Sequence, residues 1–222
     1  MARVDRTTLL RPAPHLELAL HQPERGYRFN ADSIHLVHFA ATGRAVDALC
    51  DLGAGCGVIG LSLLALGAAK RGTFVELDAE QAARCERNLR ENGLAGDVVH
   101  ADVEGLDATA PCGLVVCNPP YFAPDEGRPS PDPDRTRARF GGIERFTSAA
   151  ARACGPRGRA CFVYPAGTSM RLLAALRGSG LEPKRMRWIH PRAEAPARLL
   201  LVEARAGRPG GLVVESPRIE EL

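Results

Sequence analysis

The chain has 222 residues, of which 45% are hydrophobic and 25% are charged, and its formal net charge is +3 at pH 7. This length and composition predict one soluble globular domain with a sizeable core. No apolar run is long enough to span a bilayer, and charges and prolines interrupt the N-terminus where a secretion signal would be apolar, so we expect a cytoplasmic protein.

Apolar runs alternate with helix-like stretches, which predicts an α/β domain with a mostly parallel sheet flanked by helices. We predict strands at residues 46–52, 72–77, 97–101, 113–117, 159–164, 185–190 and 198–204, and helices at residues 57–69, 79–92, 143–154 and 168–179. Residues 1–45 are expected to form an N-terminal lid or cap before the domain at residues 46–222, and residues 211–222 an edge strand and a tail. The proline-rich residues 123–137 predict a binding loop over the carboxyl ends of the strands.

A glycine-rich turn follows the first of these strands, in the stretch CDLGAGCGVIG at residues 50–60. Gly53, Gly55 and Gly57 permit a tight turn from strand to helix and let a ligand approach the backbone closely. Gly55, Gly57 and Gly60 also match a dinucleotide fingerprint, so the turn alone leaves a dinucleotide oxidoreductase open.

Three acids, Asp51, Glu76 and Asp102, lie at or beside the ends of three successive predicted strands. Glu76 is placed to accept hydrogen bonds from ribose hydroxyls, and Asp102 from an adenine amino group. Asp51 precedes the glycines, where it would repel a pyrophosphate but attract the ammonium and sulfonium groups of S-adenosylmethionine. The acids therefore favour S-adenosylmethionine as the ligand.

A stiff corner, Asn118-Pro119-Pro120-Tyr121, ends the fourth predicted strand. For the strand order that we expect, 3-2-1-4-5-7-6, this corner lies at the switch point where ligands bind. The Asn118 side-chain oxygen and the Pro119 carbonyl can accept the two N–H groups of an exocyclic amine as the nitrogen becomes positively charged. Pro120 restricts Pro119 to extended conformations, and Tyr121 offers a face on which a planar group can stack.

The motifs DLGAGCGVIGL, VELD, AD and CNPPYF together resemble those of class I S-adenosylmethionine-dependent amino-methyltransferases with an Asn-Pro-Pro-Tyr motif, over residues 45–165. The resemblance implies a Rossmann-like fold with a seven-stranded, mostly parallel sheet. The stretch HQPERGYRFNADSIHLVHFA, residues 21–40, resembles the segment before the first strand in bacterial tRNA (valine) adenine-N6 methyltransferases.

The resemblance implies an S-adenosylmethionine-dependent enzyme that methylates an exocyclic amine, adenine N6 in tRNA, with no metal and no membrane partner. It implies amine recognition by Asn118, Pro119, Pro120 and Tyr121, and donor binding by Asp51, Gly53, Gly55, Gly57, Glu76, Leu77, Asp102, Val103 and Asn118. Tyr27, Arg28 and Asp32 would line the mouth of the site or, alternatively, pack as part of a lid on the sheet edge.

Two alternatives stay beside this hypothesis and the oxidoreductase. A protein-glutamine N5-methyltransferase acting on a release factor or ribosomal protein would use the same corner, although about 45 residues before the first strand are few for the helical domain that such enzymes resemble. A non-catalytic RNA protein that binds the methyl donor is the other. The chain ends at ESPRIEEL, where family members often continue, and residues 123–134 are richer in proline than the family pattern; both departures concern substrate recognition.

The seven cysteines include no Cys-x-x-Cys pair and lie mostly in apolar runs, so we expect buried thiols, with no disulfide framework and no metal. Two groups of cations either bind phosphates or form a solvated face: Arg135, Arg137, Arg139 and Arg145, and then Lys184, Arg185 and Arg187. The sequence does not indicate an oligomeric state.

Overall fold

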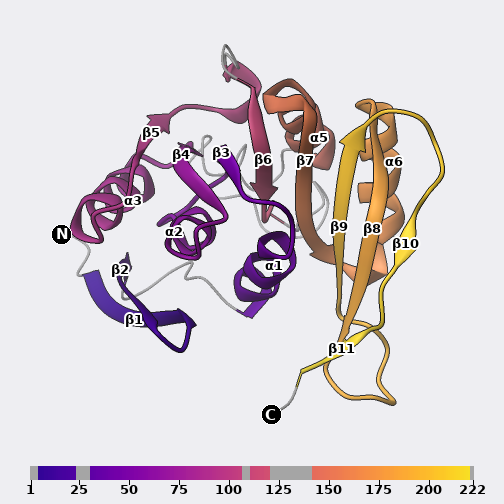
Figure 1. Cartoon of the computed structure of the whole chain (residues 1–222), viewed down its shortest axis with the longest axis horizontal. Coiled ribbons are helices and arrows are strands. Elements are labelled where there is room, and N and C mark those ends of the chain that lie inside the picture. The colour runs from indigo at the N-terminus through magenta and orange to yellow at the C-terminus, as the bar shows by residue number, and fades with distance from the viewer. Residues whose placement is uncertain (1–4, 24–30, 107–110, 121–141, 221–222) are drawn as a thin grey trace, which may run out of the picture.

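A computed structural model of the chain describes residues 5–23, 31–106, 111–120 and 142–220. Its centre is a nine-stranded sheet with helices on both faces, and a two-stranded hairpin lies at one side (Figure 1). The strands are β1 (Asp5–Ala13), β2 (Leu16–Pro23), β3 (Val46–Leu52), β4 (Ala69–Glu76), β5 (Gly96–His100), β6 (Cys112–Cys117), β7 (Cys154–Pro165), β8 (Leu181–His190), β9 (Leu199–Ala206), β10 (Val213–Val214) and β11 (Arg218–Ile219). The helices are α1 (Ala31–Ala41), α2 (Val58–Ala65), α3 (Ala79–Glu91), α5 (Ile143–Ala153) and α6 (Ser169–Gly178), with 3-10 turns η1 (Val103–Gly105) and η2 (Ala166–Thr168).

The main strands follow the order β5-β4-β3-β6-β7-β9-β8, and β10 and β11 both pair with β8 at the far edge. Strands β3 to β7 are parallel, whereas β9 runs antiparallel between β7 and β8. When the strands from β3 to β9 are counted 1 to 7 along the chain, this is the predicted order 3-2-1-4-5-7-6. The predicted Rossmann-like fold is therefore confirmed. The order reverses between β3 and β6, which is the switch point of the sheet.

Helices α1, α2 and α3 cover one face of the sheet, and α5 and α6 cover the other (Figure 1). Strand β3 shows how both faces are filled: Leu49 packs in the core on the α1–α3 side, whereas Cys50 and Leu52 pack in the core on the α5–α6 side. Successive side chains of a strand point to opposite faces, so a continuous apolar run is the pattern of a strand buried on both sides. The central strands were predictable for this reason.

Helix α3 lies close to its predicted bounds because its ends and its buried stripe are both marked in the sequence. Asp78 precedes the helix, and its Oδ1 accepts hydrogen bonds of 2.9 and 3.1 Å from two backbone N–H groups of the first turn. Ala82, Cys85 and Leu89 are spaced three and four residues apart and form the buried stripe. Gly93, just after the helix, has a left-handed φ of 62°, as is usual at a helix C-terminus.

Helix α2 is shorter than the predicted helix at residues 57–69, which was wrong at its C-terminal end. The helix ends at Ala65, and β4 already begins at Ala69. Gly67 takes a left-handed φ of 71°, and the Ala68 N–H bonds to the Leu63 carbonyl at 2.9 Å, which turns the chain into the next strand.

The N-terminal hairpin β1–β2 is fastened to α3 by two asparagine side chains. Asn88 accepts a hydrogen bond from the His21 N–H at 2.7 Å and donates one to the His21 carbonyl at 3.0 Å. Asn92 does the same to Ala19, at 3.0 and 2.9 Å. Each amide thus satisfies an N–H and a carbonyl of β2 that no neighbouring strand among the described residues pairs with on that side. The role of residues 1–45 as a lid or cap stays a prediction.

The C-terminal segment returns along β8 as two short parallel strands, β10 and β11. The edge strand predicted within residues 211–222 is therefore present, but it is divided in two. No helix among the described residues is long and apolar enough to cross a membrane.

All seven cysteines are present as thiols, and six of them are buried. Burial raises the pKa of the Cys56 thiol to about 11 and that of Cys161 to about 12. Their side chains fill the core as small hydrophobic groups.

Candidate active site

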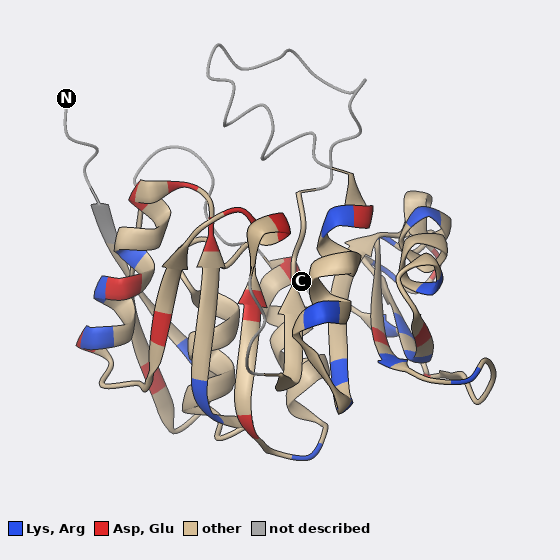
Figure 2. Cartoon of the chain, turned by 90° about the horizontal axis from the view of Figure 1, so that it is seen from above, with Lys and Arg blue, Asp and Glu red and all other residues tan. Residues whose placement is uncertain are grey.

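The carboxyl ends of β3, β4, β5 and β6 meet at one edge of the sheet. Leu52, the last residue of β3, pairs with Val75 of β4 and with Cys117 of β6. The glycine turn, Glu76 and the Asn-Pro-Pro corner therefore start side by side. In Figure 2 the arrows of these strands point upward, and acidic segments lie at and beyond their tips. Ligands of open α/β sheets bind at this edge, beside the switch point.

The glycine turn has the backbone that its sequence predicts. Gly53, Gly55 and Gly57 have positive φ values of 72°, 58° and 88°. A Cβ added at Gly57 would lie 2.4 Å from Leu61 Cδ1 and 2.7 Å from Cys85 Sγ, so no side chain fits there. At Gly55 no described heavy atom lies within 4 Å of an added Cβ, which leaves room for a ligand against the backbone.

Asp51 lies fully buried beneath this turn. Its Oδ2 accepts a hydrogen bond from the Gly60 N–H at 2.8 Å, whereas Oδ1 has no hydrogen-bond partner among the described residues. Burial raises the pKa of this carboxyl to about 7, against the Gly60 hydrogen bond, which lowers it, and with the nearby Glu76 charge, which raises it further. An unsatisfied buried acceptor favours a cationic or hydrogen-bonding ligand in its vicinity.

Glu76, the last residue of β4, joins the turn to the next loop. Its Oε2 accepts from the Gly55 N–H at 2.7 Å and its Oε1 from the Asp78 N–H at 2.8 Å. Burial raises the pKa of Glu76, and these two hydrogen bonds oppose that shift. A carboxylate has about four acceptor sites, more than these backbone groups occupy, so acceptor capacity remains for a hydroxyl group of a ligand.

Asp102 lies two residues beyond β5 and is bound within the protein. Its Oδ1 accepts from the Glu104 N–H at 2.9 Å and forms an ion pair with Arg145 of α5. The Arg145 side chain is only 8% exposed, so it belongs to this partly buried pair and not to an exposed phosphate-binding group. Leu77 is half-buried beside Glu76, and Val103 is buried beside Asp102.

Asn118 follows β6 directly and is half-buried at the switch point. Its Nδ2 donates a hydrogen bond of 3.2 Å to the hydroxyl of Ser33 on α1. Pro119 is buried and Pro120 half-buried, so the corner packs against the body of the protein. Two successive prolines restrict the backbone here, and the direction of the Pro119 carbonyl stays a prediction.

Three residues assigned to the site from the sequence, Tyr27, Arg28 and Tyr121, lie outside the described residues. Asp32 is described, and its side chain is 4% exposed in an ion pair of 2.6 Å with Arg198. Whether this segment lines the mouth of the site or packs as part of a lid stays a prediction.

Sequence reasoning missed three residues that hold this edge together: Ser33, Arg198 and Asn88. Asn88 donates to the Cys56 carbonyl at 2.9 Å and so ties the glycine turn to α3. Ser33 directly follows Asp32, so the segment at residues 21–40 contained a signal for it. Arg198 is 166 residues from Asp32 in the sequence, and no local pattern predicts that pairing.

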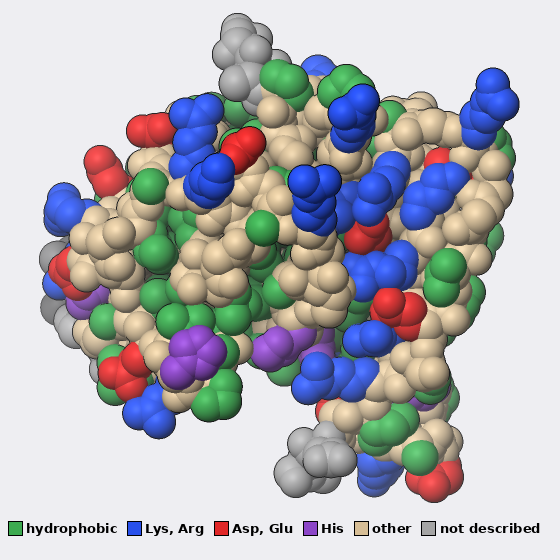
Figure 3. Space-filling model, viewed as in Figure 1, with side chains coloured by type: hydrophobic (Ala, Val, Ile, Leu, Met, Phe, Trp, Pro, Cys, Tyr) green, Lys and Arg blue, Asp and Glu red, His purple; other side chains and the backbone are tan. Residues whose placement is uncertain are grey.

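The side chains of the second predicted group of cations, Lys184, Arg185 and Arg187, bond to other groups of the protein. Figure 3 shows Lys and Arg side chains gathered over β7, β8 and β9, with acids among them. Arg185 lies 3.9 Å from the centre of the Phe39 ring and pairs with an acid of β9 at 3.0 Å. Arg187 pairs with Glu215 at 2.8 Å, and Lys184 donates to two backbone carbonyls at 2.7 and 2.6 Å. These contacts do not favour a phosphate site at this group, and Arg135, Arg137 and Arg139 lie outside the described residues.

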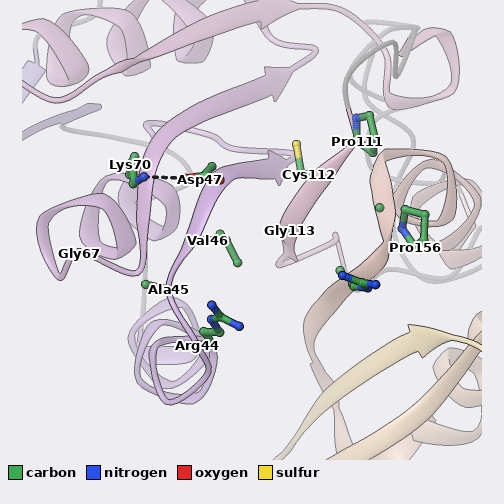
Figure 4. Close-up of a pocket in the computed structure, with 13 residues that line it drawn as sticks. Arg44, Ala45, Val46, Asp47, Gly67, Lys70, Pro111, Cys112, Gly113 and Pro156 are labelled. Atoms are coloured by element: carbon green, nitrogen blue, oxygen red, sulfur yellow. Dashed lines mark ion pairs between the residues drawn. The ribbon is translucent and has the colours of Figure 1, made fainter.

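A hollow of about 770 Å³ lies at the opposite edge of the sheet, at the amino ends of β3, β4, β6 and β7 (Figure 4). Lys70 and Asp47 form an ion pair of 2.7 Å on its wall, and Arg44 and Arg157 also line it. None of the residues assigned to the site from the sequence lines this hollow, so it is separate from the candidate active site. Among the described residues no group of His, Cys, Asp or Glu is arranged to hold a metal ion.

The residues at the carboxyl edge fit S-adenosylmethionine. The open space beside Gly55 admits a ligand to the backbone, and Glu76 retains acceptor sites next to it. The unsatisfied Oδ1 of Asp51 suits the positively charged end of the donor, which a pyrophosphate would not match.

Comparisons with known proteins agree with this geometry. Residues 31–130 match the methyltransferase small domain family. The chain is 30% identical over 153 residues to a tRNA1(Val) (adenine(37)-N6)-methyltransferase of Glaesserella parasuis serovar 5, covering 66% of this chain and 63% of the relative. It is 41% identical over 75 residues to a ribosomal RNA small subunit methyltransferase C of Pseudomonas paraeruginosa, covering 33% of this chain and 22% of that protein. The chain thus spans less than two thirds of the length of either relative.

Among solved structures, the fold is similar to that of a 16S rRNA N2 G1207 methyltransferase of T. Thermophilus in complex with AdoMet and guanosine. The TM-score is 0.66 at 19% identity, covering 93% of this chain and 52% of that chain. At this identity the likeness concerns the fold. The family match supports S-adenosylmethionine, the cofactor expected from the sequence.

Proposed function

We propose that the chain is an S-adenosylmethionine-dependent N-methyltransferase that acts on adenine N6 in tRNA, and the match of residues 31–130 to the methyltransferase small domain family supports this. The observation that carries this proposal is the position of the Asn-Pro-Pro corner: it lies beside the glycine turn, at the switch point of the sheet.

The chain's own residues would hold the donor at the glycine turn. When bound, S-adenosylmethionine supplies a methyl group on a positively charged sulfur. Glu76 would accept hydrogen bonds from the ribose hydroxyls, while Asp51 would offset positive charge at the other end. Asp102 would hold the adenine, together with Leu77, which follows Glu76, and Val103, which follows Asp102.

The corner would grip the amine that receives the methyl group. The side-chain oxygen of Asn118 and the carbonyl of Pro119 would accept its two N–H groups, which leaves the nitrogen lone pair directed at the donor. Both acceptors interact more strongly as the nitrogen becomes positively charged, so they stabilise the transition state more than the ground state. Orientation rather than acid–base chemistry is then the main contribution of these residues.

The similarity to a tRNA1(Val) (adenine(37)-N6)-methyltransferase supports adenine in tRNA as the substrate. A base amine in ribosomal RNA is a second candidate, supported by the higher identity to a ribosomal RNA small subunit methyltransferase C over a shorter stretch. An amide nitrogen of glutamine presents the same chemistry to the corner, but the relatives named here are RNA methyltransferases.

The substrate is tested by incubating the protein with labelled methyl donor and, separately, total tRNA, ribosomal subunits and release factors from a strain that lacks the protein. We expect label in tRNA, and nucleoside mass spectrometry should identify it as N6-methyladenosine. Label in ribosomal RNA would support the second candidate, and label only in protein would contradict both.

The Asn118→Ala variant checks the role of the corner in the same assay. We expect turnover to fall by about 100-fold or more, because preorganised acceptors of this kind contribute several kcal/mol to the transition state. Donor affinity, measured by calorimetry, should change little. Near-normal turnover would contradict the role of Asn118 as an acceptor for the amine.

A further inference from the structure

A primary amide can present either of two ends of nearly equal size. If the side chain of Asn118 rotated by half a turn, its NH₂ group would take the place of its oxygen. Two N–H donors would then face the N–H groups of the target amine, and no hydrogen bond could form. The proposed role of Asn118 is therefore favoured by a neighbour that binds the nitrogen end and leaves the oxygen end toward the substrate.

Ser33 is placed to provide this fixation. The Asn118 Nδ2 group donates to the Ser33 hydroxyl at 3.2 Å, so the nitrogen end of the amide is turned toward α1. Ser33 is only 2% exposed, so bulk water has little access to its hydroxyl. Rotating the amide would bring the oxygen end to Ser33 and require the hydroxyl hydrogen to turn.

The first turn of α1 is itself held in place by an ion-pair network in which Asp32 is buried and its partners are partly exposed. Asp32, next to Ser33, pairs with Arg198 at 2.6 Å, and Arg198 also bonds both carboxylate oxygens of Glu220. His35, one turn further along α1, bonds Glu220 at 2.7 Å. The start of β9 and the C-terminal segment thus fix the helix that carries Ser33.

We propose that Ser33 is a positioning residue for Asn118: its hydroxyl binds the amide nitrogen and keeps the carbonyl oxygen directed at the amine. The inference rests on the proposed function of Asn118 in binding that amine. Ser33 touches neither the donor nor the amine in this account, and it acts only through Asn118.

The hydrogen bond is tested directly by NMR on the ¹⁵N-labelled protein without substrate. In the wild type we expect one pair of side-chain amide signals, assigned by its loss in Asn118→Ala, with slow exchange against solvent. In Ser33→Ala these signals should shift and exchange faster. The control is Ser62→Ala, which removes a hydroxyl of a fully buried helical serine that bonds only within its own helix; it should leave them unchanged.

Turnover on an unmodified valine tRNA transcript supplies the second measurement. We expect Ser33→Ala to lower kcat by about tenfold, the value of one well-placed hydrogen bond, with unchanged donor affinity. In an Asn118→Ala background, Ser33→Ala should cause no further loss, because its effect passes through Asn118. A merely structural role would lower stability and turnover in both backgrounds.

The two proposals fail in different ways. Unchanged Asn118 amide signals in Ser33→Ala, turnover equal to that of Ser62→Ala, or an equal loss in both backgrounds would each overturn the positioning role. A wild-type protein that methylates no RNA would overturn the proposed function instead, and the amide signals would then decide alone whether Ser33 orients Asn118.

Discussion

Asp51 has a carboxyl group in a fully buried position, where the charged form is disfavoured. Its pKa is raised to about 7, whereas an unfolded aspartate has an ordinary pKa of 3.8. Between these two pH values the folded protein therefore keeps a proton on Asp51 that the unfolded chain has lost. The stability linked to this proton is complete below pH 3.8 and is lost as the pH rises through about 7. A bound cationic group favours the ionised form, so donor binding and loss of this proton should be linked.

We therefore expect donor affinity to rise by about tenfold between pH 5.5 and 7.5, in line with a group that titrates near neutrality. The measurement is calorimetry across this range on the wild type and on Asp51→Asn. The asparagine variant should have a flatter profile, and the difference between the two curves isolates Asp51 from Glu76, whose pKa is also raised. Asp47→Asn, at the opposite edge of the sheet, is the matched control; parallel profiles for all three proteins would contradict the linkage.

At the level of single residues, the sequence predicted the chemistry of the site better than its internal contacts. The positive φ of Gly53, Gly55 and Gly57 follows from their place in a strand-to-helix turn. The partly buried pair of Asp102 with Arg145 was not predictable, since the two lie on different elements and neither has a distinctive local pattern.

At the level of elements, Asn88 is a joint between three parts of the fold. It is fully buried on α3, and its amide bonds both the N–H and the carbonyl of His21 on β2 as well as the carbonyl of Cys56 in the glycine turn. The hairpin, the helix and the donor turn thus depend on one side chain. Removing it leaves buried backbone groups without partners.

We expect Asn88→Ala to lower the free energy of unfolding by about 2–3 kcal/mol, because it strands buried polar groups. Asn92→Ala, which removes a similar but partly exposed bridge to Ala19, should lower it by only about 1 kcal/mol. Urea unfolding of both variants checks the order. Equal losses would contradict the assignment of Asn88 as the main joint, and weaker donor binding by Asn88→Ala alone would support the link to the turn.

Elements were predictable where the sequence shows a clear apolar pattern, as in β3, or residues typical of helix ends, as in α3. The N-terminal hairpin was not predicted as such, because its strands pair with each other and with two asparagines and not with the main sheet. The C-terminal strands β10 and β11 are only two residues each, too short to show a strand pattern.

At the level of the whole molecule, the C-terminal segment and α1 meet at Arg198. This guanidinium pairs with the buried Asp32 and with Glu220, so it links residues near both ends of the chain. Contacts over such distances in sequence depend on the completed topology, which is why the sequence predicted the strand order but not this network.

Arg198→Ala should lower the free energy of unfolding by about 1–3 kcal/mol, because it removes the partner of a buried carboxylate while the arginine itself is partly exposed. Arg192→Ala, an exposed arginine in the same connection between β8 and β9, is the control and should change stability little. Denaturation monitored for both variants tests this, together with turnover, which should also fall in Arg198→Ala if α1 positions Asn118. An Arg198→Ala protein as stable and as active as the control would contradict the role of the network.

Two of the buried thiols can report how often different parts of the protein open. With a pKa of about 11, fewer than about one Cys56 thiol in a hundred is ionised at pH 8, so an alkylating reagent reacts with it only when its surroundings open. Cys56 lies within the glycine turn and Cys161 in the middle of β7, so the first should report opening of the turn and the second unfolding of the whole sheet. The rates of labelling can be measured by mass spectrometry of alkylated peptides over time. We expect bound donor to slow the labelling of Cys56 far more than that of Cys161. Equal protection of both thiols would mean that the turn opens only when the entire molecule unfolds.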